Sequence, residues 1–116
     1  MKKLFMLFGF AVTASLAFGQ KKVSIDSLSG HLNEKVIVCS EVYGVKELEK
    51  MTFINVGAAY PKSPLTIVIF AKDLPNFKTT PSALYGNKKI CVTGELKDFK
   101  GKMEIIVSKP EEITVE

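Results

Sequence analysis

Arginine and tryptophan are both absent from this chain of 116 residues. Its basic residues are 16 lysines and one histidine. Without arginine, the protein has no planar guanidinium group to hold a phosphate or carboxylate through two parallel hydrogen bonds. Without tryptophan, it lacks the largest ring for stacking. These two absences argue against tight, base-specific recognition of nucleic acid.

Catalytic motifs are also missing, because the sequence has no P-loop, no H-E-x-x-H and no nucleophile elbow. The single histidine, His31, lies beside a predicted turn, and we interpret it as a surface or capping residue rather than a base or metal ligand. Acidic residues that lie close together, Glu47 with Glu49 and Glu111 with Glu112, are scattered among lysines, which is typical of a solvated face. The sequence therefore predicts a protein that is not an enzyme and that uses no cofactor or metal.

The first 19 residues have the features of an export signal. Lys2 and Lys3 precede an apolar run over residues 4–16, and Ala17-Phe18-Gly19 supplies small residues where a signal peptidase cleaves. A membrane anchor is the alternative, but the run is shorter than the roughly 20 residues that a bilayer crossing needs. We expect a signal peptide at residues 1–19, cleavage before Gln20, and an exported protein, periplasmic or secreted, with no membrane span after cleavage.

The remaining residues, 20–116, are enough for one compact domain and too few for two. Loss of the two lysines near the N-terminus would leave 14 lysines against 12 acidic residues, so the formal charge would fall from +4 to about +2. A nearly neutral domain is a weak electrostatic attractor for polyanions, and this favours a ligand other than nucleic acid.

Hydrophobic residues follow a period of two along most of the domain, which is typical of half-buried strands. The pattern predicts five strands, at about residues 36–43, 52–56, 65–70, 90–96 and 103–108. A turn over Gly57 to Pro64 joins the second and third strands, and a short helix near Ser82 to Tyr85 precedes the fourth. One helical turn is also predicted between Ser24 and Leu32. An all-β fold with this break between strands three and four fits a small Greek-key barrel.

Six runs in this order resemble the oligonucleotide/oligosaccharide-binding fold (OB-fold) domains of exported bacterial proteins. The runs are His31 to Cys39, Thr52 to Gly57, Tyr60-Pro61, Ile67 to Phe70, Lys89 to Gly94 and Lys100 to Lys102. The sequence departs from that pattern at Asn33, Ser40 and Met103, which affects turn and strand geometry more than ligand chemistry. The resemblance implies a five-stranded closed barrel at residues 20–116 that binds nucleic acid.

The only two cysteines, Cys39 and Cys91, lie at polar-side positions of the first and fourth predicted strands. In the barrel that the resemblance implies, these strands are antiparallel neighbours, so the two thiols can face each other. Export and an even number of cysteines favour a disulfide, and two packed thiols are the alternative.

Ligands of this barrel class usually lie over the second and third strands, between the loop after the first strand and the loop before the last. Here those loops are residues 43–50 and 97–102, and both contain lysines. The resulting candidate nucleic-acid-binding residues are Lys46, Phe53, Asn55, Tyr60, Lys97, Phe99, Lys100 and Lys102. Lysines around aromatic rings can attract a phosphate backbone and stack on bases. The alternative is that Phe53 fills the core and the lysines only keep the surface soluble.

Two classes of function remain open at this stage. The first is a module that binds single-stranded DNA or RNA with weak sequence preference, which the family resemblance favours. The second is a module of the bacterial envelope that binds a protein, a glycan or a small ligand through the same face, which the nearly neutral charge favours.

Overall fold

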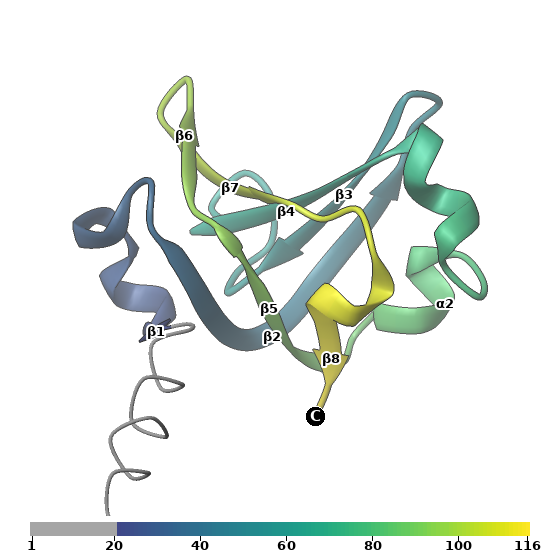
Figure 1. Ribbon diagram of the computed structural model, residues 1–116. Helices are drawn as coiled ribbons and strands as arrows, with labels where there is room; N and C mark the ends of the chain where they lie inside the picture. The colour runs from purple at the N-terminus through teal and green to yellow at the C-terminus, as the bar shows by residue number, and fades with distance from the viewer. Residues whose placement is uncertain (1–20) are drawn as a thin grey trace, which may run out of the picture.

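One long strand, β2 (Lys35–Glu47), organises the structure, a computed structural model that describes residues 21–116. Its first half pairs with β5 (Lys89–Glu95) and its second half with β3 (Met51–Val56), both antiparallel. A β-bulge between Val42 and Gly44 separates the two halves. Because a bulge bends and twists its strand, β2 can serve both parts of the sheet (Figure 1).

The fold is mostly β, with eight strands in the order β6-β7-β4-β3-β2-β5-β8 and β1 paired to β2. The remaining elements are short and lie between the strands or at the ends of the sheet. Their bounds are β1 Lys21–Lys22, η3 Ile25–His31, β4 Leu65–Phe70, η4 Ala71–Asn76, α2 Pro81–Tyr85, β6 Lys97–Phe99, β7 Lys102–Ile106, η5 Pro110–Glu112 and β8 Ile113–Val115.

The five predicted strands correspond to β2, β3, β4, β5 and β7, and the predicted short helix corresponds to α2. The structure adds three short strands, β1, β6 and β8, to that prediction. The helical turn expected before β2 is the 3-10 helix η3, whose N-cap Ser24 accepts a hydrogen bond from the amide of Asp26. The predicted signal peptide lies outside the described residues.

Two segments that we expected to be loops are strands instead. Tyr43 to Glu47 continue β2, because the bulge lets the chain keep pairing with β3, and the connecting loop shrinks to residues 48–50. Lys97 to Phe99 form β6, which pairs with β7 around a two-residue turn at Lys100 and Gly101. Both turn residues have positive φ, 53° and 85°, as a tight hairpin turn of this length requires.

Side chains from the inner face of the sheet form one hydrophobic core, to which η3, α2 and the segment after η4 also contribute. Its fully buried members include Val36, Ile54, Ile67, Leu96 and Ile105. A Cβ on Gly94 would lie 2.5 Å from the side chain of Ile105, so β5 crosses β7 at close range. Among residues 21–116, no helix is long and apolar enough to cross a membrane.

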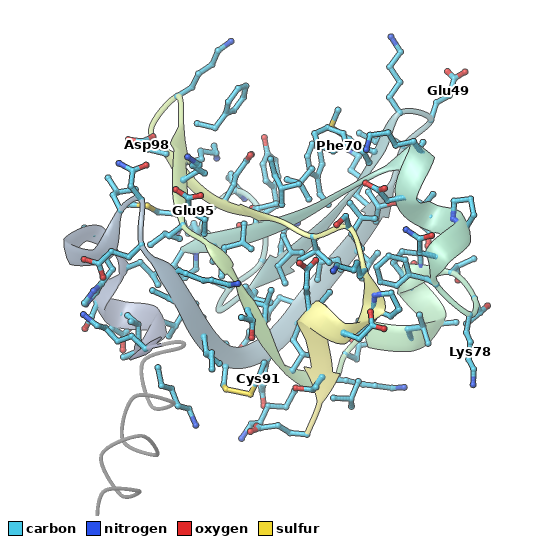
Figure 2. All side chains as sticks on the ribbon, viewed as in Figure 1. Glu49, Phe70, Lys78, Cys91, Glu95 and Asp98 are labelled. Carbon is cyan, nitrogen blue, oxygen red and sulfur yellow. A yellow bond between two sulfur atoms is a disulfide. The ribbon has the colours of Figure 1, made fainter. Side chains whose placement is uncertain are left out.

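The predicted disulfide is present. Cys39 and Cys91 are direct partners in the β2–β5 ladder, and their sulfurs are bonded. The bond links positions 52 residues apart in the sequence, on the outer side of the sheet. Figure 2 shows it at the opposite end of the molecule from the β6–β7 hairpin, which Asp98 marks.

Candidate functional site

The register of the strands brings polar and aromatic side chains into two rows across the outer face of β3, β4 and β7. In the first row, Lys46 lies opposite Phe53, which lies opposite Val68. In the second row, Asn55 lies opposite Thr66, which lies opposite Glu104. Residues that face each other in a sheet project on the same side, so the two rows form one continuous surface.

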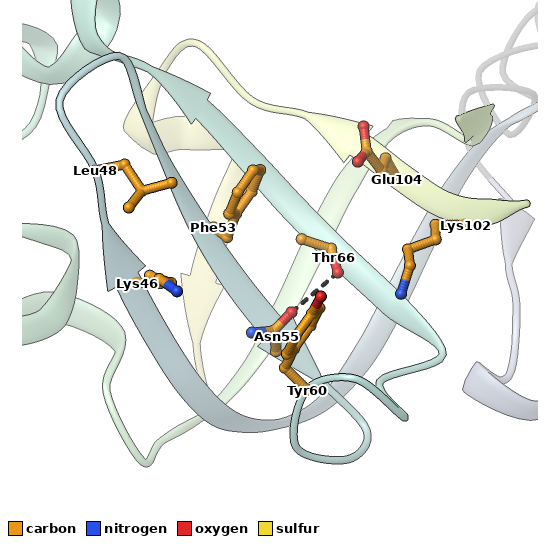
Figure 3. Close-up of a pocket in the computed structure, with 8 residues that line it drawn as sticks. All are labelled: Lys46, Leu48, Phe53, Asn55, Tyr60, Thr66, Lys102 and Glu104. Atoms are coloured by element: carbon orange, nitrogen blue, oxygen red, sulfur yellow. Dashed lines mark hydrogen bonds between the residues drawn. The ribbon is translucent and has the colours of Figure 1, made fainter. Parts of the chain in front are cut away.

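A groove with a volume of about 210 Å³ lies over these rows (Figure 3). This is less than the 300 Å³ or more typical of pockets for drug-sized molecules, so the groove suits a single flat ring or sugar unit of a longer ligand. The residues that line it are Lys46, Leu48, Phe53, Asn55, Tyr60, Thr66, Lys102 and Glu104.

Five of the eight candidate binding residues therefore meet in one place: Lys46, Phe53, Asn55, Tyr60 and Lys102. Phe53 is half-buried and lies outside the core cluster, so the alternative that it fills the core is wrong. Its ring forms part of the groove, where it can contact a ligand (Figure 3).

Tyr60 reaches the groove from the long loop between β3 and β4, and its side chain is 69% exposed. The Nζ atom of Lys102 lies 5.1 Å from the centre of the Tyr60 ring, a cation–π contact between this loop and β7. An exposed ring with a cation beside it combines a stacking surface with a positive charge, which is the combination that single-stranded nucleic acids bind.

Asn55 is nearly buried at the base of the groove, with 7% of its surface exposed. Its Oδ1 atom accepts hydrogen bonds from the hydroxyls of Ser63, at 3.2 Å, and Thr66, at 3.0 Å. These two bonds fix the orientation of the amide.

Glu104 is the one acidic residue that lines the groove. Burial raises the pKa of its carboxyl above the usual value, because the charged form loses contact with water. A carboxylate at this position repels phosphate, so the groove is not uniformly cationic.

The other three candidates, Lys97, Phe99 and Lys100, lie on the β6–β7 hairpin and do not line the groove. Phe99 is 56% exposed and is the cross-strand partner of Lys102, so it faces the same side as the groove. The Nζ atom of Lys100 lies 5.4 Å from the centre of its ring. Lys97 forms a surface ion pair with Glu95 at 3.2 Å, a contact of small energetic value.

Three lining residues were not among the candidates: Leu48, Thr66 and Glu104. Two of them had a signal in the sequence. Thr66 is the one hydroxyl residue in the apolar run of β4, and Glu104 is the one acidic residue in β7. A polar side chain within an apolar strand indicates which side of that strand faces solvent.

Exposed apolar side chains gather on the same side of the molecule. The described residues expose six large ones, and four of these belong to the groove, to the hairpin or to the outer row of β7: Leu48, Tyr60, Phe99 and Ile106. Clusters of exposed apolar side chains that are rimmed by polar residues often mark binding surfaces.

A second hollow, of about 450 Å³, lies between the β2–β3 loop, η4 and the start of α2. Thr52, in its wall, has the one buried side-chain oxygen in residues 21–116 that lacks a hydrogen-bond partner. None of the candidate binding residues lines this hollow.

Groups that could hold a metal ion are few. Within residues 21–116, Cys39, Cys91 and Glu116 form the one cluster of potential ligands, and its two sulfurs are bonded to each other. His31 ends η3 and shares a hydrogen bond of 2.9 Å with Glu34, which lowers the pKa of that carboxyl. This agrees with a surface role for the histidine.

No family model matches the sequence, and no curated protein matches it either. Solved structures do resemble the fold. Against asparaginyl-tRNA synthetase from Pyrococcus horikoshii, the TM-score is 0.58 at 21% identity, over 82% of this chain and 22% of that one. Against the Stn1–Ten1 complex of S. pombe, the TM-score is 0.55 at 13% identity, over 71% of this chain and 57% of that one.

A third similar structure is an OBody bound to hen egg-white lysozyme, with a TM-score of 0.55 at 15% identity, over 85% of this chain and 96% of that one. The chain thus spans about a fifth of the synthetase and nearly all of the OBody. Identities this low establish a common fold and no more. These neighbours are OB-fold domains, as the sequence resemblance implied, and the groove lies on the outer face of β3 and β4, the second and third of the five predicted strands.

Proposed function

We propose that this protein is an exported OB-fold module that binds single-stranded nucleic acid with weak sequence preference. The observation that carries the proposal is the groove on β3, β4 and β7, where two rings and two lysines meet a fixed amide. Aromatic rings stack on any base, and lysines attract the backbone without distinguishing sequence. The tRNA synthetase among the structural neighbours supports the same class of ligand.

The ligand path continues from the groove onto the β6–β7 hairpin. Lys102 lines the groove, Phe99 is its cross-strand partner, and Lys100 lies over the Phe99 ring. Lys97 is the first residue of β6. A strand that stacks on Phe53 and Tyr60 can thereby extend to Phe99 with its phosphates near the hairpin lysines. Affinity is expected to be modest, since the face carries no arginine and one carboxylate.

We also propose that the sheet closes into a barrel between β5 and β6, which holds the hairpin beside the groove. Leu96, the single residue between them, is fully buried. Its amide donates to the carbonyl of Glu34, and its carbonyl accepts from the amide of Asn33. The close approach of Gly94 to β7 supports closure as well. Gly94→Ala, whose added Cβ would meet Ile105 of β7, should lower the free energy of unfolding in urea, and an unchanged value would contradict closure.

A salt titration tests the nucleic-acid proposal. We expect fluorescein-labelled (dT)12 to bind with an affinity that falls as salt rises. The variant Lys97→Ala/Lys100→Ala/Lys102→Ala should flatten the slope of log K against log salt by at most about 2, equivalent to three phosphates on a single strand. The matched control, Lys78→Ala/Lys88→Ala/Lys89→Ala, removes as many charges away from the groove and should keep the slope. Absence of binding at 20 mM salt would reject the proposal.

Export rests on the N-terminal pattern and is supported by the Cys39–Cys91 disulfide, since such bonds persist in oxidising compartments. Mass spectrometry of the protein recovered from its native host should find a chain that begins at Gln20. An intact N-terminus would contradict the signal-peptide assignment.

A second candidate function is binding of another protein or a glycan through the same face. Four exposed apolar side chains on this side favour it, as does the structural neighbour that is bound to lysozyme. The salt titration separates the two, because apolar contacts leave almost no salt slope.

A further inference from the structure

The amide of Asn55 is held in a way that limits what it can recognise. An amide oxygen has two lone-pair sites, and the Oδ1 atom of Asn55 uses both, one for Ser63 and one for Thr66. A hydroxyl has a single hydrogen to donate, so each partner is committed to this bond. The oxygen is therefore unavailable to a ligand.

The amide nitrogen remains available. Nδ2 carries two N–H donors, and no side-chain hydrogen bond from it is formed within residues 21–116. Figure 3 shows it pointing away from Thr66, toward the side of the groove where Lys46 lies. Because β3 is paired on both edges, the donor is held on a rigid strand. The base of the groove thus presents a donor and no amide acceptor.

This arrangement excludes the usual way in which asparagine recognises adenine. That contact needs two bonds, one donated to N7 and one accepted from the exocyclic amino group, and the second needs a free amide oxygen. Adenine N7 can still accept from Nδ2, but the neighbouring amino group, itself a donor, then finds no free amide oxygen and stays unpaired, which costs affinity. Thymine and uracil present carbonyl oxygens, which accept from Nδ2 and leave no amino group unpaired. Lys46 and Lys102, on the rim, are further donors. The acceptor Glu104 lies beyond Thr66 in the row, one strand farther from Asn55.

We infer that Asn55 is a specificity-determining residue that makes the groove favour thymine or uracil over adenine. The inference rests on the proposed function, since it names the base class that the same groove takes. One hydrogen bond between neutral groups contributes roughly a three- to tenfold difference in affinity. A preference of this size is compatible with binding that tolerates most sequences.

The test compares fluorescein-labelled (dT)12 and (dA)12 by fluorescence anisotropy at 20 mM salt, with the full-length protein. Adenine tracts stack on themselves, which alone can weaken their binding to any protein. The ratio of the two Kd values in the wild type is therefore compared with the same ratio in Asn55→Ala, which has no amide. We expect the preference for (dT)12 to be three- to tenfold larger in the wild type than in Asn55→Ala. Ser63→Ala/Thr66→Val frees the amide oxygen and should reduce the preference similarly, whereas Thr66→Ser keeps a hydroxyl and should preserve it.

The outcomes separate the inference from the proposed function. If neither oligonucleotide binds, the proposed function fails. If both bind and the ratio is the same in wild type, Asn55→Ala and Ser63→Ala/Thr66→Val, the function stands and the role of Asn55 is overturned. The double variant leaves Asn55 in place, so it decides the question even if Asn55→Ala does not fold.

Discussion

The two halves of β2 support different surfaces, and the bulge between them shifts the outward-facing positions from odd-numbered residues, such as Cys39, to even-numbered ones, such as Lys46. In the first half, the outward-facing Cys39 is bonded to Cys91 across the ladder. In the second half, the outward-facing Lys46 lies opposite Phe53 at the edge of the groove. The bulge after Val42 separates them. One strand thus carries a covalent cross-link in its first half and, in the proposed function, a ligand contact in its second half.

The largest expected effect comes from removing the cross-link. Cys39→Ala/Cys91→Ala should lower the free energy of unfolding by about 4 kcal/mol, because a loop of this length no longer restricts the unfolded chain. Urea denaturation of the variant and the wild type measures the difference. If the two halves of β2 act independently, this variant, under conditions in which it stays folded, should bind (dT)12 with the affinity of the wild type. A weakened affinity in the folded variant would show that the two surfaces are coupled.

A smaller effect is expected from a ring on the recognition side. Phe99→Ala should weaken binding of (dT)12 by about 1 to 3 kcal/mol at every salt concentration, because a stacking contact does not depend on counterions. Tyr43→Ala is the matched control, since Tyr43 is 50% exposed on the outer phase of β2 and does not line the groove. Equal losses from both variants would contradict the assignment of recognition to one side.

The smallest effect concerns the carboxylate in the groove. Burial raises the pKa of Glu104, so the folded state holds this proton more tightly than the unfolded chain does. Its contribution to stability is therefore present at low pH and is lost as pH rises through the raised pKa. Glu104→Gln should remove this dependence and tighten (dT)12 binding at pH 7 about twofold, as expected for one charge near a phosphate in water. Tighter binding in the wild type at higher pH would contradict the prediction.

Much of this arrangement could be predicted from the sequence, because alternation along a strand determines which side chains share a face. That rule predicted that Phe53 and Asn55 share one face of the sheet and that both cysteines lie on its outer face. It missed β6, whose three residues are all exposed and have no apolar phase to recognise. It also ended β2 too early, since Gly44 and the bulge interrupt the alternation while the hydrogen-bonded pairing continues. The bonds that fix Asn55 come partly from a loop, whose conformation no periodicity describes.

The two-residue turn at Lys100 and Gly101 has a consequence for how this fold could diversify. The hairpin ends in that turn, and its root is fixed by the buried Leu96. An insertion at the turn would therefore lengthen the hairpin while leaving the hydrogen bonds of Leu96 to the segment before β2 intact. Surface turns tolerate such insertions well. Related chains could thus acquire different ligands by exchanging hairpins of different length and charge, as antibodies do with their loops, on a framework that stays the same.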